Sequence, residues 1–98
     1  MTKEKQTKDV RQGFLEEVAK IVCSDRASTH GGPEDNFTNI AKMWSVFKRV
    51  QFTTRDVAAM MVMVKLSRII HNPNHRDSWL DIAGYAACTE SLEKQDEF

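Results

Sequence analysis

The chain has 98 residues, enough for one domain with a single core but too few to enclose a deep catalytic cavity without a second subunit. Its 14 basic residues balance its 14 acidic ones, so the overall charge gives no reason to expect binding to nucleic acid or to an anionic membrane. The polar amino terminus does not resemble a signal peptide, and no apolar stretch approaches the roughly 20 residues that span a bilayer. Cys23 and Cys88 lack the close Cys or His spacing of a zinc site and do not make a disulfide framework. A reduced, cytoplasmic location fits best.

The first half of the chain predicts two helices, because its apolar residues recur at intervals of three and four. The first helix runs from about Asp9 to Cys23, and residues 1–8 are expected to fray. A loop rich in Ser, Thr and Gly follows over residues 24–32. The second helix runs from Pro33 to Lys48, because proline suits the first turn of a helix.

A third helix is predicted from Thr54 to about Ile70, with Thr53 or Thr54 as its N-cap. Residues 57–64 are all apolar, and a helix that is apolar on every side is buried, either at the centre of a bundle or at a subunit interface. In so small a domain we expect both kinds of burial. The protein should therefore be a homo-oligomer, with a two-fold dimer as the default symmetry.

The fourth helix is expected to follow the Pro73 break, with Asp77 or Ser78 as its cap, and to run to about Leu92. Residues 93–98 should fray. Four helices joined by short loops, with almost no strand alternation and no internal repeat, predict an all-α fold. The expected architecture is a compact four-helix bundle that forms a single domain over residues 1–98.

Two carboxylates on the fourth helix, Asp77 and Asp81, lie one turn apart in a stretch that is otherwise apolar enough to be core. Like charges at this spacing destabilise a helix by roughly 0.2–0.5 kcal/mol, and a buried carboxylate costs more unless it is compensated. Mg²⁺ is one possible compensator, because it is held by carboxylates together with substrate phosphates. Salt bridges to Lys65 and Arg68 on the third helix are the other, and the residues alone leave both open.

A second candidate site lies at the start of the second helix, in residues 30–37. Free backbone N–H groups at a helix N-terminus hold phosphate, but Glu34 and Asp35 would repel an anion unless a metal bridges them. The alternative is that these acids complement the helix dipole and that His30 is an exposed loop residue. Asn36, next to the apolar Phe37, needs hydrogen-bond partners if it is buried and favours a polar site here. No phosphate-binding glycine loop, nucleophile elbow or activated cysteine is present, so covalent catalysis is not indicated.

Three segments together resemble a family of small uncharacterised phage and prophage proteins, over about residues 30–92: His30-Gly-x-Pro33-x-x-Asn36-Phe37, Asp56-Val-Ala-x-Met-Met-Val-x-x-Lys65-x-x-Arg68 and Asp77-Ser-Trp-x-Asp81-Ile-Ala-Gly-Tyr-Ala86. More distantly, the last segment is similar to a motif of the MazG-like all-α nucleoside triphosphate pyrophosphohydrolases. That resemblance implies an oligomeric helical bundle in which carboxylates of two helices hold Mg²⁺ against a nucleotide's phosphates. It implies metal ligands at Glu34, Asp35, Asp77 and Asp81, and nucleotide contacts at His30, Asn36, Lys65 and Arg68.

The chain departs from the MazG-like pattern, in which two acids lie three residues apart on one helix and a second pair lies on the next. Here Asp77 and Asp81 are four apart, and the other pair would have to come from the adjacent Glu34 and Asp35 or from Asp56. Three functions follow as hypotheses: Mg²⁺-dependent cleavage of a nucleoside triphosphate, nucleotide binding or sequestration without hydrolysis, and docking of the apolar third helix on a host protein. If the chain is encoded by a phage, the cytoplasm in question is that of the host.

Overall fold

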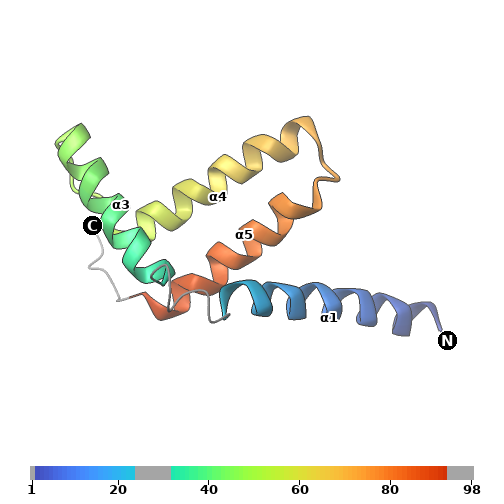
Figure 1. Cartoon of the computed structure of the whole chain (residues 1–98). Helices are drawn as coiled ribbons and strands as arrows, with labels where there is room; N and C mark the ends of the chain where they lie inside the picture. The colour runs from blue at the N-terminus through green and yellow to red at the C-terminus, as the bar shows by residue number, and fades with distance from the viewer. Residues whose placement is uncertain (1, 24–31, 93–98) are drawn as a thin grey trace.

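The computed structural model describes residues 2–23 and 32–92, and within them the fold is helical without any strand. Its elements in chain order are α1 (Lys3–Val22), α3 (Pro33–Lys48), α4 (Thr54–His71), α5 (Arg76–Cys88) and the short 3₁₀ helix η1 (Thr89–Ser91), all visible in Figure 1. Over residues 2–23 and 32–92, the prediction of an all-α fold with four helices in a single domain is confirmed.

The helices are arranged around α5, which packs against α1 on one side and forms an antiparallel hairpin with α4 on the other (Figure 1). The remaining helix, α3, crosses the N-terminal part of α4, and the N-terminal half of α1 extends beyond the other helices. The molecule measures 55 × 33 × 26 Å. Its radius of gyration is 15.9 Å, whereas about 13 Å is typical of a globular domain of 100 residues. Such an elongated arrangement leaves whole helix faces uncovered.

The core lies where α3, the start of α4 and the end of α5 meet. Val57 is completely buried there, because it faces α3 from the first turn of α4. The other buried members of this cluster are Phe37, Ala41, Ala58, Cys88 and Leu92. The core therefore joins residues that are more than 50 positions apart in the sequence and closes one end of the bundle.

The predicted boundaries of α3 and α4 agree with the structure, whereas α1 begins at Lys3 rather than at Asp9. Thr2 caps α1, and its hydroxyl accepts a hydrogen bond from the backbone N–H of Lys5 at 3.2 Å. Apolar periodicity missed this first stretch because residues 2–9 are all polar and exposed. Lys, Glu and Gln form helices readily without a buried stripe. The predicted fraying of residues 93–98 lies outside the described part of the chain.

The predicted cap of the fourth helix was wrong, because α5 begins at Arg76 with His75 as its N-cap. Ser78 lies instead inside the first turn, where its hydroxyl is 2.7 Å from Nδ1 of His75 and is buried. Asp77 is exposed beside it. The helix also ends earlier than expected, at Cys88, and η1 carries the chain on to the buried Leu92.

The expectation that the third helix is surrounded within the bundle was also wrong. Only Val57 and Ala58 of α4 are buried, whereas Met63 and Ile70 are 62% and 78% exposed. The helices that pack on α4, chiefly α3 and α5, do not suffice to enclose it, and its outer face has no cover within the described part of the chain. None of the described helices combines the length and the apolar composition needed to cross a membrane.

The start of α4 is stabilised by a reciprocal capping box, and this leads to a testable prediction. The Thr53 hydroxyl accepts from the Asp56 N–H at 3.0 Å, while the Asp56 carboxylate accepts from the Thr53 N–H at 2.9 Å. We expect Thr53→Ala to lower the free energy of unfolding by about 1 kcal/mol, because it removes a cap at the helix that carries the core. Thr7→Ala is the matched control, since the Thr7 hydroxyl bonds only the Lys3 carbonyl on an exposed face of α1. Equal losses in the two variants, in urea titrations, would contradict the prediction.

Candidate functional site

A pocket of about 540 Å³ lies between α1, α3, α4 and α5. Its walls are mostly apolar, formed by Val18, Ile21, Val22, Phe37, Ile40, Met43, Met61, Leu80 and Tyr85. Three polar side chains also line it, Asn36 and Asn39 of α3 and Asp81 of α5. A volume within about 300–1,000 Å³, with apolar walls and a few convergent polar groups, is typical of small-molecule sites.

The helices form this pocket because each contributes one face. On α5, Leu80, Asp81, Gly84, Tyr85 and Cys88 share a face by their spacing of three to four residues. Gly84 allows the close approach of α1, since a Cβ at this position would lie 3.3 Å from Cγ1 of Val22. The Phe37 ring packs against the Tyr85 ring, with the two centroids 5.9 Å apart. The pocket is thus bounded by two aromatic rings and by the closely packed α1–α5 pair.

Asp81 forms a salt bridge with Lys65, which is one of the two compensations that the sequence left open. The Lys65 ammonium lies 3.0 Å from one carboxylate oxygen of Asp81, and the side chains are 14% and 40% exposed, respectively. The cation comes from α4 and the acid from α5, so the pair links the two helices of the hairpin. The negative charge of Asp81 is therefore compensated by the Lys65 ammonium.

Asn36 and Asn39 present two amide side chains to the pocket from neighbouring positions of α3. Both residues are exposed, and among residues 2–23 and 32–92 neither amide side chain makes a hydrogen bond. Each offers a donor and an acceptor to a ligand. The sequence pattern singled out Asn36 but assigned Asn39 no role. Its spacing of three residues from Asn36 was the signal that could have found it.

The four predicted metal ligands do not come together in the described part of the chain, where no group of three His, Cys, Asp or Glu side chains is placed to hold an ion. Glu34 accepts a hydrogen bond from the Ser91 hydroxyl, which ties the start of α3 to η1. This bond, followed by one from the backbone N–H of Glu34 itself, lowers the pKa of Glu34 below its usual value. Asp35 and Asp77 are exposed at the first turns of two different helices. Magnesium stays a prediction.

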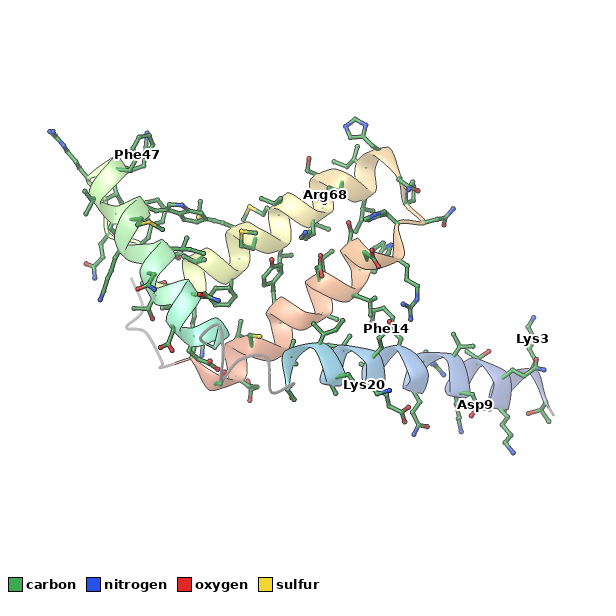
Figure 2. The ribbon with its side chains drawn as sticks, in the orientation of Figure 1. Lys3, Asp9, Phe14, Lys20, Phe47 and Arg68 are labelled. Atoms are coloured by element: carbon green, nitrogen blue, oxygen red, sulfur yellow. The ribbon has the colours of Figure 1, made fainter. Side chains whose placement is uncertain are left out.

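The remaining predicted nucleotide contacts are divided between the pocket edge and the surface. Lys65 reaches Asp81, while Arg68 is exposed three residues further along α4, where Figure 2 labels it near the C-terminal half of the helix. Residues three apart share a helix side, so the two cations lie on one side of α4. His30 lies outside the described residues. The structure thus places Asn36 and Asp81 in one pocket, and Lys65 contacts Asp81.

Cys88 is a pocket residue that the sequence did not suggest as part of the site. Burial raises the pKa of its thiol, and the nearby charge of Glu34 raises it further. A thiol in this environment stays protonated and is a weak nucleophile. Cys88 therefore forms part of the apolar wall.

Comparison with known proteins places the chain among phage proteins. A family model described as a domain of unknown function, DUF6378, matches residues 13–93. The Gene 55 protein of Mycobacterium phage L5 is 38% identical over 81 residues, which are 82% of this chain and 52% of that protein. The Gene 55 protein of Mycobacterium phage D29 is 33% identical over 84 residues, 86% of this chain and 56% of that protein. The chain thus matches about half the length of these relatives.

No solved structure matches the chain significantly. The predicted resemblance to a phage protein family is confirmed, while the more distant similarity to MazG-like hydrolases stays a prediction. Because the family model covers residues 13–93, which include α3, α4, α5 and the pocket, the chain belongs to the DUF6378 family.

Proposed function

We propose that this chain binds a nucleotide, or a similar ligand that joins a flat ring to a phosphate, in the pocket between α1, α3, α4 and α5. The observation that carries this proposal is that Asn36 and Asp81, from different helices, line one pocket of about 540 Å³. The Phe37 and Tyr85 rings give the pocket flat apolar walls against which a base packs.

The polar groups of the pocket fit the two ends of such a ligand. The Asn36 and Asn39 amides supply donors and acceptors for a base edge. The Lys65 ammonium has three N–H donors, so its contact with Asp81 leaves others for a phosphate oxygen. Arg68, on the same side of α4, adds a guanidinium fork that suits phosphate.

Binding without cleavage ranks above hydrolysis because of the state of the carboxylates. Asp81 is engaged by Lys65, and among the described residues no group of three or more His, Cys, Asp or Glu side chains is placed to hold an ion. Hydrolysis of a nucleoside triphosphate with Mg²⁺ would require Asp81 to release Lys65 and bind the metal instead. Asp77 or another carboxylate would have to serve as a further metal ligand. Docking of α4 on a host protein is the third hypothesis.

Isothermal calorimetry tests the proposal with nucleoside triphosphates and cyclic nucleotides, each with and without Mg²⁺. We expect Asn36→Ala and Asn39→Ala to weaken binding at least tenfold, about 1.4 kcal/mol, because each removes a hydrogen-bonding group from the pocket. The fold should persist, since both residues are exposed. The matched control is Asn74→Ala, in the turn between α4 and α5, which should bind like the unchanged chain.

Two further measurements separate the alternatives. Arg68→Ala should weaken binding of the phosphorylated ligand, and Arg68→Lys should recover only part, because lysine lacks the planar fork. Release of pyrophosphate in the presence of Mg²⁺ would establish the enzyme in place of the binder. Absence of binding to every member of the panel would refute nucleotide binding and leave docking on a host protein as the first hypothesis.

A further inference from the structure

We propose that the outer face of α4 is the interface with a second copy of this chain, and that the two α4 helices pack antiparallel around a two-fold axis. The α4 stripe, as we call it, consists of Ala59, Met63, Leu66 and Ile70. All four are exposed, although three of them are large apolar residues. This proposal concerns a surface on the side of α4 opposite to Lys65 and does not depend on the proposed nucleotide site.

The stripe forms one continuous helix face. Its residues recur at intervals of four, three and four, which keeps them within a narrow arc of a helix with 3.6 residues per turn. Lys65 and Arg68 are the charged residues between positions 57 and 70, and both fall on the other side of α4. An apolar face without charge over three turns favours another apolar helix over a charged partner.

The order of the stripe favours a second copy of the chain itself. Intervals of four, three and four read the same in both directions, as the contact of a helix with its own antiparallel copy requires. In that arrangement Met63 meets Leu66 of the second copy, and Ala59 meets Ile70. A small residue opposite a large one, with two large residues of similar size at the centre, lets the helices pack closely along the whole stripe.

The end of α3 supplies the rest of the interface. Val46, Phe47 and Val50 are strongly exposed, and Figure 2 shows Phe47 at the end of α3 that lies away from α5. Because α3 packs on the N-terminal part of α4, antiparallel pairing brings the C-terminal half of the other α4 alongside it.

The available area is close to what a dimer needs. The six large apolar residues of the two faces are between 44% and 81% exposed. Together they offer an area on the order of 700 Å², close to the roughly 800 Å² that one partner of a standard interface buries. Those residues are Val46, Phe47, Val50, Met63, Leu66 and Ile70.

Light scattering coupled to gel filtration, at micromolar concentration, tests the interface. The whole chain should have twice the 11.2 kDa mass of one copy. The double variants Met63→Lys/Leu66→Lys and Met63→Glu/Leu66→Glu should each be monomeric, because like charges meet at both central contacts. An equimolar mixture of the two should return to the dimer mass, since each lysine then faces a glutamate. Circular dichroism checks that each variant keeps its helices, which exposed positions should allow.

The control is Val10→Glu, at a similarly exposed apolar residue on α1, which should leave the dimer unchanged. A monomer mass for the unchanged chain would overturn the proposal. Dimers that survive both charged variants would place the interface elsewhere and equally overturn it. Monomeric variants that do not combine on mixing would overturn the antiparallel pairing.

Discussion

Replacing Phe37 with alanine should cost about 3–5 kcal/mol of unfolding free energy, a large share of the roughly 5–15 kcal/mol that stabilises a domain of this size. Phe37 is only 5% exposed and contacts the core at the junction of α3, α4 and α5. Its ring also lies against Tyr85, which lines the pocket. The truncation therefore removes apolar contacts from the core and enlarges the pocket at once.

Phe47→Ala is the matched control for this loss, because Phe47 lies on the same helix but is 81% exposed. Both substitutions are best measured by urea unfolding in the Met63→Glu/Leu66→Glu background, so that a contact between copies does not contribute. There Phe47→Ala should change stability by less than about 0.5 kcal/mol, as exposed substitutions usually do. Similar losses at the two positions would mean that α3 does not dock through Phe37.

Breaking the Lys65–Asp81 pair should be the second large effect. Asp81→Asn removes the partner of an ammonium that is only 14% exposed and should destabilise the chain by about 1–3 kcal/mol. The cost stays below that of a fully buried pair because Asp81 is 40% exposed and water screens its charge. Lys65→Met should cost less, since it leaves the more exposed partner, and the double variant should recover part of the loss. A double-mutant cycle then measures the coupling free energy.

The same variants decide between the ion pair and a metal. With the ion pair, the loss in Asp81→Asn is the same with and without Mg²⁺. With a metal site, Mg²⁺ would raise the melting temperature of the unchanged chain. In the absence of Mg²⁺, the Asp81→Asn variant would then melt at the same temperature as the unchanged chain or higher, because the substitution relieves the repulsion between Asp77 and Asp81. The more exposed ion pair of Arg76 and Glu17 is the control. Glu17→Gln should lower the free energy of unfolding by less than Asp81→Asn does.

The sequence by itself determined the elements that local chemistry controls. The starts of α3 and α4 follow from Pro33 in a first turn and from the Thr53 hydroxyl, which act within one turn of their own helix. It also singled out Asn36, next to the apolar Phe37, and Asp81, within an apolar stretch, because such polar residues are visible in the pattern itself. It misplaced the start of α5, where several residues are suitable caps and packing selects among them.

The tertiary structure alone decided how these residues meet. Both Lys65 and Arg68 were candidates to neutralise Asp81, and the way α4 packs on α5 brings Lys65 within 3.0 Å while Arg68 stays exposed. The same packing engages Glu34 with Ser91, away from any acid cluster among the described residues. It leaves Met63 and Val64 exposed, although residues 57–64 read as a buried segment. Apolar composition indicates that a residue favours burial, but only the relative position of the helices determines what covers it.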